Sequence, residues 1–322
     1  MLSVLLVTFP FFVLVLCGYL ATRRGMLPQA AIPGLNTFVL YFALPCLLYR
    51  FGASTPIGQL LDTTLILFYL LCALIMVGFT IAVTRSPRIG WNDASLGALV
   101  AAFPNTGFMG VPLLVALLGA GAAGPAIVSI AVDMLITSSL CIALSRLDGA
   151  DEHGASRAFK LAMKGVVVNP MPWAIVLGAI ASAANFVLPT PVQATVGLLA
   201  DASSPVALFT IGAVLARAQM NTTTAARPGE YVPVVLIKLF VHPLLVGLAG
   251  LAAIQLGFAI SPFALTVLVL VAALPSASNV SMLAERFGAD TGRIARIILL
   301  STVLAFFTFS AAVTLVTGAP FF

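Results

Sequence analysis

The chain has 322 residues, of which 61% are hydrophobic and only 8% are charged, with a formal net charge of +5. A soluble protein needs charged residues at roughly a quarter of its positions, so much of this surface must face lipid. No basic run with interleaved aromatic residues is present, which argues against a nucleic-acid partner. The composition predicts a single membrane domain, residues 1–322, with the lipid bilayer as its surroundings.

Ten apolar windows are long enough to cross the roughly 30 Å of hydrocarbon in a bilayer, at about 20 residues a span. In chain order they are 3–21, 32–51, 63–84, 94–118, 123–145, 165–185, 193–216, 231–256, 262–285 and 294–316. The connections are short except for two polar segments, 146–164 and 217–230. The sequence therefore predicts an all-α membrane protein of ten transmembrane helices.

The basic residues are placed unevenly among the connections. Of the 15 Lys and Arg residues, all but Arg50 and Lys238 follow odd-numbered windows. No positive charge precedes the first window, so we interpret it as a retained helix rather than a signal peptide. By the positive-inside rule, both termini are non-cytoplasmic and the short 146–164 loop is cytoplasmic. A multi-pass protein of the cell membrane (inner or plasma membrane) is expected.

The two halves of the chain, about 1–145 and 165–316, resemble each other. A shift of 160 residues aligns three pairs: Pro10 with Pro170, Gly18 with Gly178, and Pro45 with Pro205. Beyond 217–230, a shift of 171 residues aligns Pro104 with Pro275. Each half holds five windows, an odd number, so the halves are expected to be inverted relative to each other. A 5 + 5 inverted repeat is typical of secondary transporters.

The fourth and ninth windows each contain helix-breaking residues near mid-membrane, followed by small polar side chains. Backbone that leaves the helix at this depth must lie against protein or a watery cavity. The amides freed at the start of a half-helix carry partial positive charge and suit a carboxylate. Ordinary proline kinks are the alternative. The candidate substrate-binding residues are Pro104, Asn105, Thr106, Gly107, Pro275, Ser276, Ser278 and Asn279.

Ionisable residues inside the windows are costly and are candidates for ion coupling. They are Asp133, Asp201, Lys238 and His242, with Asp62 near an end of the third window. Each has a plainer alternative. The aspartates could pair with backbone or a cation, Lys238 could extend to the interface, His242 could be a packing residue, and Asp62 could be a solvated end residue. No cofactor or metal is expected, because the four cysteines lie in apolar segments without metal-like spacing. Coupling to H⁺, to Na⁺ or to neither stays open.

Several stretches resemble the auxin efflux carrier family, in particular its compact bacterial members identified as malonate or malate permeases. They are 35–45, 103–112, 169–170, 209–215, 238–243 and 274–288, and they cover nearly the whole chain. The resemblance implies a scaffold and a transport bundle, as in sodium/proton antiporters and bile-acid transporters. It also implies that the fourth and ninth helices cross at Pro104 and Pro275, that Asn105 touches the substrate's carboxylate, and that a homodimer can form.

The chain departs from the plant members of this family at two places. Their long cytoplasmic loop corresponds to the short 146–164 here, so its regulation does not carry over. A basic residue expected four positions after Asp62 is Ile66 in this chain, which leaves a shared coupling mechanism open.

The function predicted is secondary transport of a small organic anion (a mono- or dicarboxylate, malonate-, malate- or auxin-like) by alternating access. An anion channel or passive facilitator is the main alternative, and a receptor or scaffold role is a further one. Hydrolase motifs such as His-Glu-x-x-His and Gly-x-Ser-x-Gly are absent from the sequence, as is a Gly-x-x-x-x-Gly-Lys-Ser/Thr loop. An enzyme or a nucleotide-driven pump is therefore not expected.

Overall fold

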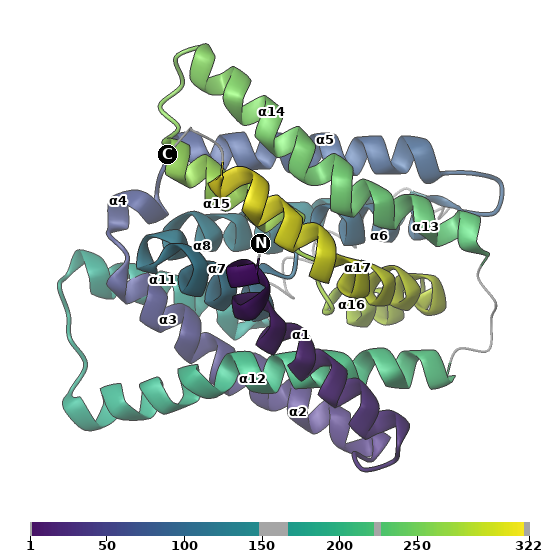
Figure 1. Ribbon diagram of the computed structural model, residues 1–322, viewed down its shortest axis with the longest axis horizontal. Helices are drawn as coiled ribbons and strands as arrows, with labels where there is room; N and C mark the ends of the chain where they lie inside the picture. The colour runs from purple at the N-terminus through teal and green to yellow at the C-terminus, as the bar shows by residue number, and fades with distance from the viewer. Residues whose placement is uncertain (1, 148–166, 222–226, 319–322) are drawn as a thin grey trace.

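The structure, a computed structural model, describes residues 2–147, 167–221 and 227–318. Within these ranges every named element is a helix (Figure 1). The helices of the first half are α1 (Leu2–Arg23), α2 (Ile32–Phe38), α3 (Leu44–Ser54), α4 (Ile57–Leu60), α5 (Thr63–Thr84), α6 (Trp91–Ala102), α7 (Val111–Leu118), α8 (Ala123–Val132) and α9 (Ser138–Leu144). Those of the second half are α11 (Pro170–Ala183), α12 (Thr190–Asn221), α13 (Pro228–Leu236), α14 (His242–Gln255), α15 (Pro262–Ala273), α16 (Val280–Phe287) and α17 (Thr291–Thr317).

Each of the ten predicted windows overlaps at least one of these helices. By length and apolarity, seven helical stretches of the described chain qualify as membrane spans. They are Leu6–Arg23, Gln29–Ser54, Ile57–Thr84, Ala120–Leu144, Thr190–Asn221, Pro228–Gln255 and Thr291–Thr317. Three further apolar helices are shorter: Thr106–Leu118, Pro170–Ala183 and Pro262–Ala273. An all-helical membrane protein is thus confirmed, whereas ten spans in a 5 + 5 repeat remain a prediction.

Several long helical stretches contain one widened, π-helical turn. These turns are Val39–Ala43, Thr106–Gly110, Asp133–Thr137 and Ile237–Val241. In three of the four, a proline follows two residues after the turn: Pro45, Pro112 and Pro243. A proline lacks the amide hydrogen for the i−4 bond and its ring crowds that carbonyl, so the preceding turn widens. Such turns often occur at functional sites, and two of these carry Asp133 and Lys238.

One set of helices packs backbone against backbone. We call α1, α2, α3, α11 and α12 the framework helices; α1, α2, α3 and α12 occupy the lower part of Figure 1. In α1, a Cβ added at Gly18 would lie 1.8 Å from the carbonyl oxygen of Phe209 in α12. A Cβ added at Gly212 would lie 1.9 Å from the carbonyl oxygen of Val15. Only glycine permits so close a crossing of α1 and α12.

The second framework crossing, between α3 and α11, repeats these contacts. A Cβ added at Gly178 would lie 2.8 Å from the carbonyl oxygen of Tyr49, and one added at Gly52 would lie 3.5 Å from that of Ile175. Subtracting 160 from Gly178 and Ile175 gives Gly18 and Val15, and adding 160 to Tyr49 and Gly52 gives Phe209 and Gly212. The residues that make one crossing are therefore sequence equivalents of those that make the other.

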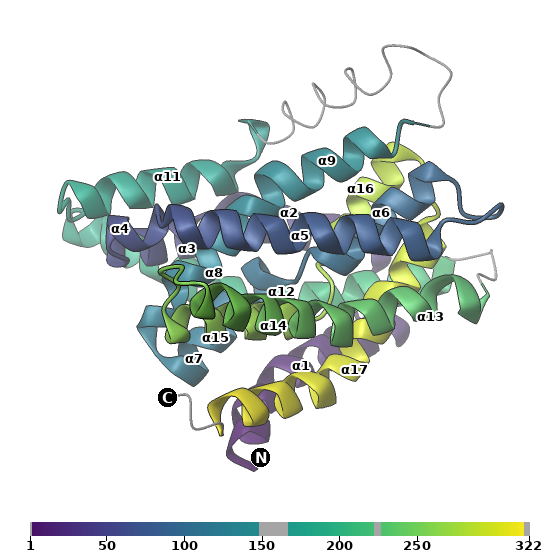
Figure 2. The same cartoon turned by 90° about the horizontal axis from the view of Figure 1, so that it is seen from above.

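Helices α5 to α9 and α13 to α17 form a second set, which we call the bundle. Figure 2 shows α5 and α14 lying side by side along this part of the molecule. Large apolar side chains on their outer faces are exposed, among them Leu67, Leu71, Leu244 and Leu248. A soluble surface rarely carries so many, and they fit a lipid-facing surface. By contrast α6 and α15 lie inside, with every residue of Ala94–Ala102 buried. The ends of these two inner helices position the candidate site.

Candidate functional site

The candidate site lies where two non-helical segments pair in the interior. Helix α6 ends at Ala102 and the next helical turn begins at Thr106, while α15 ends at Ala273 and α16 begins at Val280. Both gaps contain a proline, Pro104 or Pro275, which cannot donate a backbone hydrogen bond. The two segments instead bond to each other as a short antiparallel bridge between Pro104 and Ser276.

Two backbone hydrogen bonds hold this bridge together. The amide of Asn105 donates to the carbonyl of Pro275 at 2.8 Å, and the amide of Ala277 donates to the carbonyl of Phe103 at 3.0 Å. The amide of Ser276 donates to Oγ of Ser301 in α17, at 3.3 Å. The structure thus brings together candidate residues that lie about 170 positions apart in sequence.

The side chains around the bridge are polar, buried and incompletely hydrogen-bonded. Asn105 is 4% exposed, and Thr106 and Ser276 are fully buried. Within the described residues, Oδ1 of Asn105, Oγ1 of Thr106, Oγ of Ser276 and Oδ1 of Asn279 have no hydrogen-bond partner. An unsatisfied buried polar group costs about 1–3 kcal/mol. This cluster of unsatisfied groups is therefore costly unless a ligand or water meets it.

Backbone amides next to the bridge are also unpaired. Those of Gly107 and Phe108, at the start of the helix leading into α7, donate to no carbonyl of the described chain. The same holds for the amides of Ser278 and Asn279, which precede α16. Free amides at the start of a helix attract negative charge. The arrangement can donate several hydrogen bonds to one anion.

Asp133 is fully buried inside the bundle. It lies in the π-helical turn between α8 and α9, where its carboxylate accepts hydrogen bonds from two hydroxyl groups. Tyr69 Oη of α5 donates at 2.9 Å and Thr137 Oγ1 donates at 3.1 Å. Asp133 forms no ion pair with a basic side chain of the described residues. The alternative in which it pairs directly with a cationic residue is therefore not observed.

Lys238 and His242 form a second buried group, one turn apart at the start of α14. Nζ of Lys238 donates to the carbonyl of Ala272 at 2.9 Å and lies 3.0 Å from Nδ1 of His242. Ala272 is in the last turn of α15, where carbonyls lack helical partners and a cation is stabilised. Lys238 is fully buried, so it does not extend to the interface. Lys238 and Asp133 have opposite charges that attract each other within the bundle.

The other two acidic candidates have local partners away from the bridge. Asp201 is not enclosed as expected: it pairs with Arg50 at 2.6 Å, and the two side chains are 70% and 40% exposed. Asp62 is the N-cap of α5 and accepts a hydrogen bond from the amide of Leu65 at 3.0 Å. Neither observation places these residues at the paired segments.

Sequence reasoning missed two residues that the structure brings to these groups. Thr137 follows Asp133 by one turn, so helical spacing could have found it. Tyr69 lies 64 positions from Asp133, and no local pattern connects them. Groups of three or more His, Cys, Asp or Glu residues that could hold a metal are absent from the described residues.

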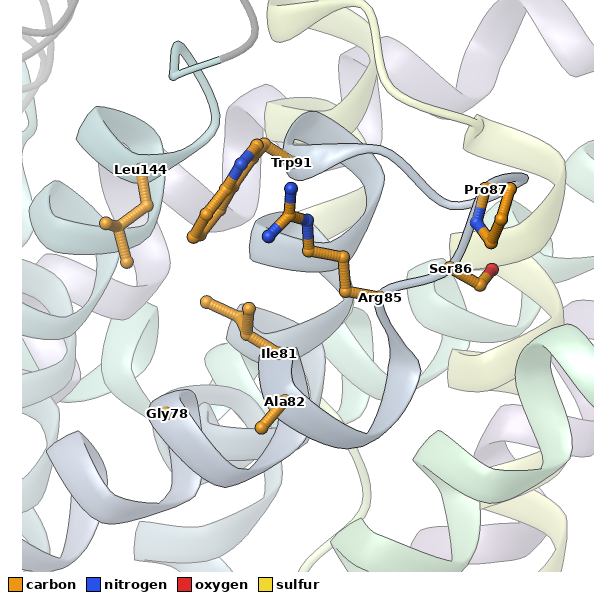
Figure 3. A pocket seen from close by; sticks show the side chains of 8 residues that line it. All are labelled: Gly78, Ile81, Ala82, Arg85, Ser86, Pro87, Trp91 and Leu144. Atoms are coloured by element: carbon orange, nitrogen blue, oxygen red, sulfur yellow. The ribbon is translucent and has the colours of Figure 1, made fainter.

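A more spacious cavity lies elsewhere. Its volume is about 810 Å³. It is lined by residues at the end of α5, at the start of α6 and at the end of α9, which Figure 3 shows. There the guanidinium of Arg85 lies 4.4 Å from the ring centre of Trp91, a cation–π contact. None of the candidate residues lines this open cavity, so its size alone does not make it the functional site.

Comparison with known proteins identifies the family. The model of a family described as "Membrane transport protein" matches residues 3–313. The "Putative malonate transporter" of Rhizobium meliloti is 29% identical over 95% of this chain and 94% of its own length. An "Uncharacterized transporter" of Methanothermobacter thermautotrophicus is 29% identical over 91% of this chain and 92% of its own.

A third relative, "Uncharacterized transporter YfdV" of Escherichia coli K12, is 28% identical over 88% of each chain. These names describe transporters and not enzymes, and transport implies a small-molecule substrate. The resemblance to the auxin efflux carriers is confirmed. This chain therefore belongs to the membrane transport protein family and is a multi-pass membrane protein.

Proposed function

We propose that this protein is a secondary transporter that moves a small organic anion across the cell membrane by alternating access. The observation that carries the proposal is the pairing of Phe103–Asn105 with Leu274–Ala277 in the interior, beside unpaired amides and unsatisfied polar side chains. A carboxylate bound there accepts hydrogen bonds from the amides, from the hydroxyl groups of Thr106 and Ser276, and from the carboxamide of Asn105. Hydrogen bonds to a charged group are the stronger ones.

A 5 + 5 inverted repeat, with ten spans, accounts for two features of the fold. Two of the three short apolar helices belong to windows that a proline divides. Thr106–Leu118 follows Pro104 in the fourth window, and Pro262–Ala273 precedes Pro275 in the ninth. The glycine contacts of the α1–α12 crossing recur at sequence-equivalent residues in the α3–α11 crossing. Equivalent contacts made twice support two copies of one structural unit, as in other secondary transporters.

The substrate class follows from the site and from one relative. The site offers donors in both halves, and the candidate residues Pro104 to Gly107 and Pro275 to Asn279 include no acidic side chain to repel an anion. The name of the Rhizobium meliloti relative contains malonate, a dicarboxylate. We propose a mono- or dicarboxylate substrate, malonate first among those to be tested.

Coupling to a cation is assigned to Asp133, with Lys238 as its charged neighbour. Both are buried in π-helical turns, and Lys238 bonds the end of α15, one of the helices that lead into the paired segments. Protonation or ion binding at Asp133 would change the charge balance next to Lys238 and so bias the position of α15. Either H⁺ or Na⁺ could be the coupled cation in this arrangement.

For the orientation of the protein, we propose that both termini are non-cytoplasmic, as the distribution of basic residues indicates.

Counterflow into proteoliposomes tests the proposal. Purified protein is reconstituted with unlabelled malonate inside, and labelled malonate is added outside at trace concentration. A carrier exchanges internal for external substrate and so accumulates label transiently, which an anion channel or passive facilitator does not do. Accumulation that requires internal malonate supports the proposal. Label entry that is independent of internal malonate would instead favour the channel.

A further inference from the structure

A narrow cavity separates the framework helices from the bundle beside the paired segments. Its volume is about 20 Å³, room for roughly one water molecule. Framework residues of α2, of the π-helical turn Val39–Ala43 and of α12 form one wall, and Phe108, Ser278 and Asn279 belong to the other. The cavity thus meets the polar groups of the candidate site from between the two sets of helices.

One face of α12 lines this cavity from its inner part towards the end of the helix. Ala207, Thr210, Val214 and Arg217 recur at helical spacing along that face. The ten helical steps from Ala207 to Arg217 rise about 15 Å along the helix axis. The distribution of basic residues assigns the end of α12 to the cytoplasmic side. Arg217 therefore lies on the cytoplasmic approach to the candidate site.

Arg217 differs from two other arginines, the buried Arg293 and the partly exposed Arg50, whose side chains have partners in the structure. Arg293, which is 2% exposed, donates to the backbone carbonyls of Glu230 and Asp93, and Arg50 pairs with Asp201. Arg217 is half-buried, yet its side chain forms no ion pair or hydrogen bond with any residue in the described ranges. Among the described residues that line its cavity none is acidic, and the polar ones Asn36, Ser278 and Asn279 are neutral.

A partly desolvated cation without a counter-charge attracts an anion into its cleft. We propose that Arg217 binds the second carboxylate of a dicarboxylate whose first carboxylate is held at the paired segments, an inference that rests on the proposed function. A guanidinium presents parallel donors that match a carboxylate, with greater geometric selectivity than an ammonium. Arg217 then makes the site selective for dicarboxylates over monocarboxylates.

Because the cavity is narrow, the substrate can contact Arg217 only in a state in which the cavity is wider. A dicarboxylate needs more room than one water molecule, so it reaches Arg217 when the bundle moves away from α12 on this side. The long arginine side chain extends from the framework, whereas Asn279 belongs to the bundle. A substrate bound by both would connect the two sets of helices at the start of the transport movement.

The test compares malonate with malonamate, in which a neutral carboxamide replaces one carboxylate. Each competes against labelled malonate in the counterflow assay with full-length protein. We expect Arg217→Gln to weaken malonate binding by about ten- to a hundredfold, the range for a lost hydrogen bond to a charged group, and to leave malonamate binding unchanged. Arg217→Lys restores part of the preference. Arg24→Gln removes an exposed basic residue assigned to the same side and serves as the matched control.

The outcomes separate this inference from the proposed function. Equal losses for malonate and malonamate in Arg217→Gln would overturn the inference, since the residue would then act on folding or on both ligands alike. Unchanged malonate binding would also overturn it, while counterflow by the wild type would still support the carrier. A wild type that exchanges neither ligand would reject the carboxylate site itself. Retained malonamate binding also shows that the variant is folded.

Discussion

The framework helices and the bundle obtain their packing in opposite ways. At the framework crossings, glycines bring backbone against backbone, and the polar side chains described there, such as Arg50 and Asp201, lie at the surface. The interior of the bundle holds Asp133, Lys238, His242 and the unsatisfied groups around Asn105 and Ser276. Burial of such groups is costly, and a lipid-embedded protein does not need them for stability.

This difference separates what holds the fold from what performs transport. Close helix crossings without side chains between them are stiff, because protein interiors are densely packed and compress little. Unpaired amides and unsatisfied oxygens, by contrast, can be matched by a ligand in one state and by water in another. Substitutions at the framework crossings should therefore change stability, and substitutions in the interior of the bundle should change transport.

The largest effect is expected at Gly18. In Gly18→Val, the added Cβ would overlap the carbonyl oxygen of Phe209, 1.8 Å away, so α1 and α12 must separate. Overpacking typically costs about 1–3 kcal/mol and occasionally more. We expect most of the detergent-purified protein to lose monodisperse elution. Gly178→Val, with 2.8 Å to the Tyr49 carbonyl, should be milder.

Gly197→Val in α12 is the matched control, because no atom lies within 4 Å of an added Cβ there. It should elute and melt like the wild type. If Gly18→Val behaved the same way, the crossing of α1 and α12 would not be as close as the structure has it.

The next effect concerns concentrative uptake. Asp133→Asn keeps the size of the side chain but removes its charge. Its oxygen can accept from one of the hydroxyl groups of Tyr69 and Thr137, and its amide nitrogen can donate to the other. We expect accumulation against a gradient to be lost, with exchange of internal for external malonate partly retained. The measurement compares two rates in the same vesicles: malonate uptake driven by an imposed H⁺ or Na⁺ gradient, and malonate exchange by counterflow.

Asp62→Asn is the control for this substitution, because asparagine also caps a helix well and Asp62 caps α5. It should transport like the wild type. If Asp133→Asn accumulated malonate fully, Asp133 would have no part in coupling. Lys238 would then also lose the role proposed for it as the charged neighbour of Asp133.

A graded effect is expected at Asn105. Asn105→Ala removes a donor without filling the space, so affinity for malonate should fall by about ten- to a hundredfold, as for a lost hydrogen bond to a charged group. Asn105→Asp should be worse at neutral pH, because its carboxylate repels the substrate. Its defect should ease at acidic pH, where the introduced carboxyl takes up a proton, whereas that of Asn105→Ala should not.

Substrate binding by both variants across pH is the measurement, with folding checked by monodisperse elution. Wild-type affinity in folded Asn105→Ala would show that the substrate is not bound at the paired segments.

Much of the helical fold could be predicted from the sequence, because hydrophobic length and charge placement are local properties. The window at 63–84 coincides with α5, Thr63–Thr84. The prolines at 104 and 275 likewise mark the two places where the structure leaves the helix within the fourth and ninth windows. The close framework crossings could not be predicted, since they depend on which glycines face each other across the fold.

The candidate site shows the same limit. Asn105 and Ser276 were found because each adjoins a breaker in its own segment. The role of Asp201 as a surface partner of Arg50 was not found, because the two residues lie 151 positions apart. In the sequence, Arg217 is one of the basic residues whose placement sets the topology. Its place on the cavity wall depends on how α12 packs beside the paired segments.

The smallest effect is expected at the ion pair of the framework surface. Arg50 and Asp201 lie 2.6 Å apart but are 40% and 70% exposed. Exposed ion pairs contribute about 0–1 kcal/mol, because solvent screens the charges and ordering two long side chains costs entropy. Asp201→Asn should therefore shift the melting temperature only slightly and leave malonate accumulation unchanged, in contrast to the same substitution at Asp133. Melting curves at low and high salt measure it, and the shift should shrink as salt increases. Loss of accumulation in Asp201→Asn would mean that the framework also takes part in coupling, and that the division between a stable framework and a functional bundle does not hold.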